Sequence, residues 1–159
     1  MTESQSRTSV VRTSARRVRT LIIDDMPAIR LLLRELLYRL EQQSGGALAF
    51  DIEEAEDAGL AWDRLWSTEV DENGSAWDLV LVDQMMPGRT GVDLIRALRS
   101  RRGFESTAML MITSESNPAI IEDARLSGAD GYLVKPFSAE SFSTEVGRAL
   151  QERWENRRS

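Results

Sequence analysis

The sequence has no cysteine and no histidine among its 159 residues. Without cysteine, disulfides and thiolate metal sites are excluded. Without histidine, the chain has no ligand for a histidine-bound zinc, no histidine general base and no histidine phosphoacceptor. Any metal held by these side chains must therefore be bound by oxygen, which favours Mg²⁺, Mn²⁺ or Ca²⁺.

The sequence also lacks long apolar runs and an excess of positive charge. No run approaches the length of a membrane span, and the first residues lack the apolar segment of a signal peptide. The net charge of −6 argues against direct binding of nucleic acid. We therefore expect a cytoplasmic protein that binds neither nucleic acid nor membranes directly.

The N-terminal segment differs in composition from the rest of the chain. It carries a single acid, Glu3, within residues 1–19, against five arginines. These are Arg7, Arg12, Arg16, Arg17 and Arg19. The composition predicts a disordered basic Ser/Thr-rich tail over residues 1–17, with a docking arm as the alternative. One folded domain is expected over residues 18–153, followed by a short tail at 154–159.

Five short apolar runs alternate with five helical patterns. The expected strands are residues 19–23, 48–52, 79–82, 109–112 and 131–134. The expected helices begin near Pro27, Ala58, Val92, Pro118 and Ser138, with Asp57 as an N-cap. A βα unit repeated five times predicts an α/β fold with a doubly wound five-stranded parallel sheet and helices on both faces.

Burial can be predicted for several of these segments. Residues 21–23, 79–82 and 132–134 are typical of strands buried on both faces, whereas 48–52 alternates like an edge strand. The polar stretch 67–76 indicates a surface loop. The apolar positions of the first helix recur at helical spacing; they are Ile29, Leu32, Leu33, Leu36, Leu37 and Leu40.

Charged and hydroxyl side chains follow four of the five strands. Asp24 and Asp25 follow the first, Asp83 the third, Thr113 ends the fourth, and Lys135 follows the fifth. The carboxyl ends of parallel strands form the ligand-binding edge of such sheets, so these residues should converge. Three neighbouring carboxylates repel each other and need a cation, which Lys135 and a bound Mg²⁺ would provide.

This set of residues suits phosphoryl transfer to a carboxylate. A carboxylate can attack phosphorus to give an acyl phosphate when the phosphoryl oxygens are stabilised, here by Mg²⁺, Lys135 and the Thr113 hydroxyl. Each residue alone has an ordinary structural explanation, as a helix cap, a turn acid, a solvated lysine or a strand-end hydroxyl. Four coincidences at four strand ends favour one shared site.

Together these residues resemble the receiver domain of two-component response regulators, the CheY-like family with the (βα)5 flavodoxin-like fold. The similarity covers residues 18–150. Its motifs are Asp24-Asp25, Asp83-x-x-Met86-Pro87-x-x-x-Gly91, Thr113-Ser114 and Gly131-Tyr132-Leu133-Val134-Lys135-Pro136-Phe137.

The resemblance implies a role for each residue of the site. Asp83 would be the phosphoacceptor, and Lys135, before a cis proline, would pair with the phosphoryl group. Mg²⁺, with Mn²⁺ as an alternative, would be held by Asp25, Asp83 and the backbone carbonyl of Met85, and through water by Asp24.

The resemblance also implies a switch. Phosphorylation would draw in Thr113 and turn Tyr132 inward, which repacks the fourth helix, fifth strand and fifth helix. The expected response surface comprises Ile120, Ile121, Ala124, Tyr132 and the outer face of residues 138–150. It could serve a homodimer or a downstream target, and the sequence does not choose between them.

The function expected is that of a stand-alone receiver. It would take phosphate from a histidine kinase or a histidine phosphotransfer protein and then bind a protein target or pass the phosphate on. Too few residues follow the last helix for an output domain. The chain is expected not to be an enzyme, and its self-dephosphorylation to be slow, because the Met85 side chain cannot orient water by hydrogen bonding.

Two other classes of function remain as alternatives. A phosphorylation-independent interaction module with this fold usually loses an acid or the lysine, and none is missing here. A Mg²⁺-dependent phosphohydrolase of the haloacid dehalogenase type expects Asp-x-Asp on one strand, whereas Asp83 is followed by Gln84 and Met85.

Overall fold

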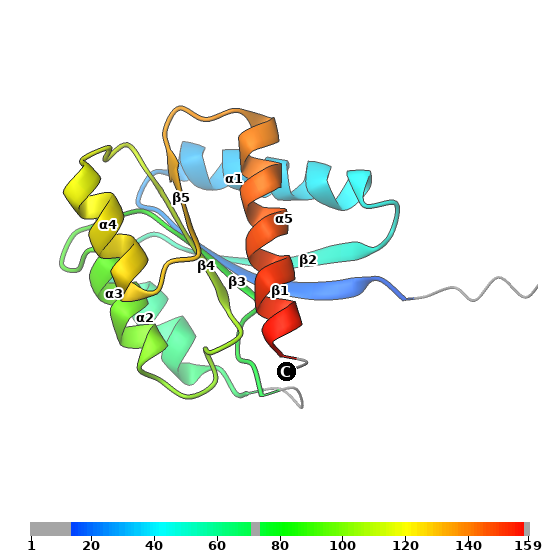
Figure 1. Cartoon of the computed structure of the whole chain (residues 1–159), viewed down its shortest axis with the longest axis horizontal. Coiled ribbons are helices and arrows are strands. Elements are labelled where there is room, and N and C mark those ends of the chain that lie inside the picture. Colours follow the sequence, from blue (N-terminus) through cyan, green and yellow to red (C-terminus); the bar gives the residue numbers. More distant parts are fainter. Residues whose placement is uncertain (1–13, 71–73, 158–159) are drawn as a thin grey trace, which may run out of the picture.

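The computed structural model describes residues 14–70 and 74–157 of the chain. In chain order its elements are β1 (Arg16–Ile23), α1 (Pro27–Gln43), β2 (Leu48–Ala55), α2 (Ala58–Ser67), β3 (Leu79–Val82), α3 (Gly91–Arg99), β4 (Ala108–Thr113), α4 (Pro118–Ser127), β5 (Gly131–Val134) and α5 (Ala139–Asn156). The strands form one parallel sheet in the order β2-β1-β3-β4-β5. This confirms the predicted α/β fold (Figure 1).

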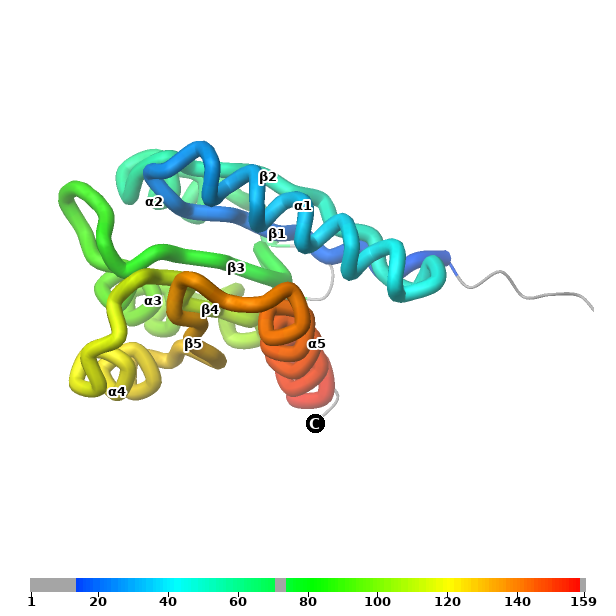
Figure 2. The backbone as a smooth tube through the Cα atoms, turned by 90° about the horizontal axis from the view of Figure 1, so that it is seen from above, coloured from blue at the N-terminus to red at the C-terminus, as the bar shows by residue number. Residues whose placement is uncertain are grey.

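The sheet separates two apolar cores. On one face, Leu21 and Val80 pack with the buried side chains of α2, α3 and α4. On the other face, Ile22 and Leu81 pack with those of α1 and α5 (Figure 2). Successive residues of a strand point to opposite faces, so β3, which is covered on both faces, is apolar at every position. The functional side chains are therefore confined to the strand ends.

Side-chain caps fix where four of the helices begin. Asp57 accepts a hydrogen bond from the N–H of Leu60, which confirms the predicted N-cap of α2. The caps of α3, α4 and α5 are Thr90, Asn117 and Ser138. These caps satisfy N–H groups that a helix start leaves without an intrahelical partner. Among the residues described, no helix combines the length and apolar character needed to cross a membrane.

The limits of the folded domain differ from the prediction at both ends. β1 begins at Arg16, two residues inside the predicted tail of residues 1–17, because its first residues pair with the start of β2. Most of that tail, residues 1–13, lies outside the described residues. α5 continues to Asn156, beyond the predicted limit at residue 153, and so takes in half of the tail predicted at 154–159.

Three predictions about the outer elements were wrong. β5 is an edge strand in which only Leu133 is buried, so residues 132–134 are not covered on both faces. β2, at the other edge, does not alternate; all its residues except Ala55 are half-buried. Leu32 is 41% exposed, because the buried stripe of α1 is narrower than its apolar pattern.

Three residues predicted at the surface are buried instead. Ser75 and Ala76, at the end of the predicted loop 67–76, are covered, and Ala76 donates its N–H to the carbonyl of Gly103. Residues 71–73 of this loop lie outside the described part of the chain. Ala124, assigned to the response surface, is 1% exposed and belongs to the core beneath α4.

Candidate functional site

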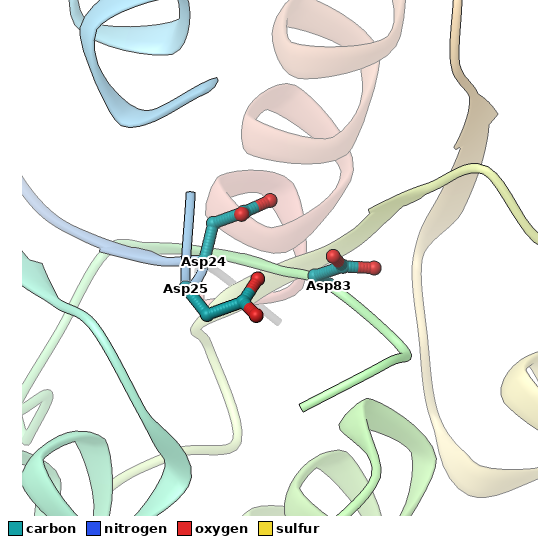
Figure 3. A group of neighbouring side chains, drawn as sticks. All are labelled: Asp24, Asp25 and Asp83. Carbon is teal, nitrogen blue, oxygen red and sulfur yellow. The ribbon is translucent and has the colours of Figure 1, made fainter. Parts of the chain in front are cut away.

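The strand order brings the three predicted carboxylates to one edge of the sheet. Ile23 of β1 lies beside Val82 of β3, so the aspartates that follow these strands become neighbours. Oxygen atoms of Asp24, Asp25 and Asp83 all lie within 4.8 Å of one another. Figure 3 shows the three side chains at the ends of the two adjacent strands. Their convergence agrees with the expectation from the sequence.

One lysine partly balances these charges. The Nζ atom of Lys135 lies 2.9 Å from Oδ2 of Asp24 and 3.4 Å from Oδ2 of Asp83. No other ion pair reaches the three carboxylates within the part of the chain that the structure describes. Three negative charges therefore face one positive charge. A divalent cation would balance this excess of two negative charges.

Burial makes this excess of negative charge unfavourable. Asp24 is 1% exposed and Asp83 7% exposed, whereas Asp25 is accessible to solvent. Burial raises the pKa of the Asp24 carboxyl above its ordinary value, and the neighbouring charge of Asp83 adds to the rise. Hydrogen bonds from Lys135 and from the N–H of Met26 act in the opposite direction. A bound cation would stabilise the ionised form of both buried carboxylates.

The backbone around the acids is held by residues that the sequence analysis did not single out. Arg30, on the first turns of α1, donates to the carbonyl of Asp24 over 2.8 Å and lies 3.4 Å from Glu54 of β2. It thus ties the end of β1 to the neighbouring strand. The sequence gives little indication of this role, because helical spacing places Arg30 on α1 but does not reveal its two partners.

Gly91 permits a close approach beside the expected phosphoacceptor. A Cβ atom at this position would lie 2.5 Å from the carbonyl oxygen of Asp83 and 2.8 Å from Cε of Met111. The N–H of Gly91 donates to the carbonyl of Gln84, whose side-chain Oε1 accepts from the N–H of Val92. The start of α3 is therefore fastened directly to the strand end that carries Asp83. Any larger residue at Gly91 would disturb it.

The predicted switch residues are linked through one residue, Glu115. Thr113 is fully buried, and its hydroxyl accepts a hydrogen bond from the N–H of Glu115 at 3.3 Å. The Tyr132 hydroxyl donates to the carbonyl of Glu115 at 2.8 Å. Among the described residues no hydrogen bond joins the Thr113 hydroxyl to Asp83. Glu115 is the intermediary that the sequence analysis did not predict.

The remaining predicted residues lie where the strand ends place them. Met85 is 61% exposed, and its N–H points to Oδ1 of Asp83 over 3.3 Å. The peptide bond between Lys135 and Pro136 is cis, as expected. The N–H of Lys135 donates to the carbonyl of Thr113, which anchors the lysine beside β4.

Comparison with known proteins agrees with this architecture. The family model of the response regulator receiver domain matches residues 20–146. The chain is 30% identical over 134 residues to the chemotaxis protein CheY of Pseudomonas aeruginosa, covering 84% of this chain and 97% of that protein. It is 30% identical over 129 residues to the chemotaxis protein CheY1 of Helicobacter pylori, covering 81% and 94%.

Solved structures show the same arrangement of elements. The chemotaxis response regulator CheY4 of Vibrio cholerae superposes with a TM-score of 0.66 and 28% identity, over 86% of this chain and 99% of that one. A receiver domain protein from Methanospirillum hungatei, at 22% identity and a TM-score of 0.70, shares the fold over 89% and 99%. With its sheet order, its acidic edge and a family match that spans most of its length, this chain belongs to the response regulator receiver domains.

Proposed function

We propose that the chain is a phosphoacceptor that carries a signal through Asp83. The observation that supports this is the charge imbalance at one strand edge, where three carboxylate oxygens lie within 4.8 Å of one another beside a single lysine. Asp83 is the member of the trio that lies at the centre of the sheet and also contacts Lys135. This combination suits a nucleophile that works next to a metal.

The residues present fit a hard divalent cation. Asp25 and Asp83 would offer carboxylate oxygens, the carbonyl of Met85 would be the third protein ligand, and Asp24 would act through water. Such an all-oxygen set with room for water is what Mg²⁺ prefers, with Mn²⁺ as the alternative. When bound, the ion would supply positive charge for the oxygens of an incoming phosphoryl group.

The transfer itself requires few groups from the protein. A carboxylate oxygen of Asp83 attacks the phosphorus of a phosphohistidine on a histidine kinase or a histidine phosphotransfer protein. A P–O bond forms as the P–N bond breaks, and its electron pair stays on the imidazole nitrogen. Lys135 lies beside Asp83 and neutralises a phosphoryl oxygen. The product is an acyl phosphate on Asp83.

The response would travel along β4 and β5. A phosphoryl group on Asp83 is a new acceptor for the Thr113 hydroxyl, and turning this hydroxyl breaks its bond with the N–H of Glu115. The carbonyl of the same residue, Glu115, accepts the Tyr132 hydroxyl, so we expect the two side chains to move together. An apolar hollow of about 210 Å³ lies beside Tyr132. It is lined by Ile121, Ala124, Arg125, Ala129, Asp130, Gly131 and Tyr132.

The proposed response surface is the face formed by α4, β5 and α5. Filling the hollow beside Tyr132 would change the shape that this face offers to a protein target or a second copy. Whether the surface dimerises or binds a target is measured by comparing the phosphorylated and unphosphorylated chain by size-exclusion chromatography. A phosphorylation-dependent change in mass would assign dimerisation.

Intact-mass spectrometry tests the phosphoacceptor directly. The chain is incubated with acetyl phosphate, with Mg²⁺ or with EDTA, alongside Asp83→Asn and the matched surface control Asp93→Asn. We expect a single phosphoryl adduct that needs Mg²⁺, persists in Asp93→Asn and is absent in Asp83→Asn. An adduct that survives Asp83→Asn would place the chemistry elsewhere. No adduct on folded wild type would instead favour a phosphorylation-independent interaction module.

A further inference from the structure

The segment between β3 and α3 carries Met85, yet it has few internal supports. No backbone group of residues 85–89 forms a hydrogen bond with another backbone group of the described chain. Met86 packs against the core, and Gly88 has a positive φ of 90° with open space around it. In Figure 2 this segment is the green loop that projects beyond β3. Its geometry must therefore depend on side-chain contacts.

Arg89 provides such a contact at the far end of the segment. Its guanidinium lies 4.2 Å from the ring centroid of Trp62 on α2. Trp62 in turn stacks on Trp66, one helical turn later, with centroids 3.6 Å apart and planes 18° apart. Arg101, from the turn after α3, covers the other side at 4.4 Å from the Trp66 ring. We call this Arg89–Trp62–Trp66–Arg101 series the stacked column.

The two arginines of the stacked column belong to different parts of the chain. Arg101 also donates a hydrogen bond to the carbonyl of Trp66, and it follows the C-terminal end of α3, away from the acidic edge. Arg89 is exposed and follows Pro87-Gly88 within the segment that carries Met85. Arg89 and Trp62 both line a hollow of about 410 Å³ between α2 and the segment. The Arg89–Trp62 contact connects the segment to α2 across this hollow.

We propose that Trp62 and Arg89 are positioning residues for the metal site. By stacking on α2, Arg89 restricts the segment 85–89 and thereby holds the Met85 carbonyl near the orientation that a divalent cation requires. A ligand that is ordered before binding loses less conformational entropy when the ion binds. This inference rests on the proposed function, because it assumes that Met85 contributes a ligand atom.

Lost positioning and lost positive charge would change the Mg²⁺ affinity in opposite directions. Arg89 carries positive charge, so its removal by itself would strengthen the binding of a cation. Trp62→Leu removes the aromatic face and leaves the charge in place. A weaker Mg²⁺ affinity in Trp62→Leu would therefore come from lost positioning and not from electrostatics.

The experiment measures Mg²⁺ binding by isothermal titration calorimetry in wild type, Trp62→Leu, Arg89→Gln and the double variant. An exposed cation–π contact corresponds to a two- to fivefold change in affinity. We expect the Mg²⁺ dissociation constant to rise by about this factor in Trp62→Leu. Because Trp62 and Arg89 act as one bridge, adding Arg89→Gln to Trp62→Leu should weaken binding no further.

The matched control is Arg101→Gln, which breaks the opposite end of the same column. It should leave the Mg²⁺ dissociation constant unchanged, although it also loosens α2. Trp62→Phe retains a ring beneath Arg89 and should restore most of the wild-type affinity. If Arg101→Gln and Trp62→Leu weaken binding equally, the column has only a structural role.

A second readout needs no metal. Amide hydrogen exchange in EDTA should be faster for residues 85–89 in Trp62→Leu and in Arg89→Gln than in wild type, and unchanged there in Arg101→Gln. Equal exchange in all four proteins would overturn the inference. Failure of the proposed function is recognised separately, because wild type would then neither bind Mg²⁺ nor form an adduct on Asp83.

Discussion

Two aspartates at opposite ends of the sheet have side chains of equal, low exposure and opposite surroundings. The side chains of Asp83, after β3, and Asp130, before β5, are each 9% exposed. Asp130 pairs with Arg99 at 2.8 Å and with Arg153 at 2.6 Å. Asp83 faces two further carboxylates and has one lysine at 3.4 Å. Burial alone therefore does not separate a structural acid from a functional one.

The balance of charge does separate them. Two arginines surround one carboxylate at the Asp130 end, and Asp130 also accepts the N–H of Met109. Its hydrogen-bonding capacity is filled within the protein, as a stable buried ion pair requires. At the Asp83 end, three carboxylates share one ammonium group. That end keeps an excess of negative charge, which would favour the binding of a cation.

The largest predicted effect comes from removing Arg99, one of the two arginine partners of Asp130. Arg99 donates to the carbonyls of Phe104, Thr107 and Gly128 as well as to Asp130. Arg99→Met should lower the free energy of unfolding by about 3–5 kcal/mol, because it leaves a buried carboxylate with one partner fewer. Urea denaturation monitored by circular dichroism measures this change.

Arg96→Met on the same helix is the matched control. Arg96 pairs with Asp123 on the surface, with 57% of its side chain exposed, and such pairs contribute about 1 kcal/mol or less. If the two variants lost the same stability, the ion pairs of Asp130 would contribute no more than an exposed pair. Folded Arg99→Met should still accept a phosphoryl group from acetyl phosphate with Mg²⁺.

Replacing aspartate by asparagine should change the free energy of unfolding by a smaller amount, and with opposite signs at the two ends of the sheet. In EDTA, Asp83→Asn should raise the free energy of unfolding by roughly 1 kcal/mol, because two repulsions disappear with one attraction. Asp130→Asn should lower it, because two ion pairs are lost. Both values come from urea denaturation of the metal-free proteins. Destabilisation by Asp83→Asn would contradict the view that its surroundings lack positive charge.

The smallest effect concerns the titration of Tyr132. Partial burial raises the pKa of its phenol, and the negative charges of Glu115 and Asp83 add to this. Because the folded state favours the neutral phenol, the resulting stability is present below the ordinary pKa of about 10 and is lost as pH rises through the folded pKa. The chain has two tyrosines, so Tyr38→Phe leaves Tyr132 alone. In that variant, the phenolate absorbance should develop at a pH above the ordinary tyrosine pKa. Ionisation at a pH below the ordinary pKa would contradict the direction of the shift.

The acidic edge was predictable because it depends on topology. Alternating strands and helices imply one parallel sheet, and every strand of such a sheet ends at the same edge. Asp24, Asp83 and Lys135 could therefore be brought together from their positions after apolar runs alone. The start of α2 at Asp57 followed from local capping chemistry in the same way.

Contacts between distant side chains were not predictable. The periodicity of α3 places Arg99 on a helix but does not reveal that Asp130 lies beside it. Trp62 and Trp66 share a helix face, yet nothing local indicates that Arg89 and Arg101 cover them. Leu32 shows a related limit, since helical spacing does not tell how wide the buried stripe is.

Isothermal titration of Mg²⁺ into the metal-free chain shows directly whether the acidic edge is a metal site. We expect a single bound ion in wild type and in Asp93→Asn, and greatly weakened binding in Asp25→Asn and Asp83→Asn. The last two proteins must be folded, which circular dichroism verifies. Equal Mg²⁺ binding in all four proteins, or none in wild type, would show that the unbalanced acidic edge is not a metal site.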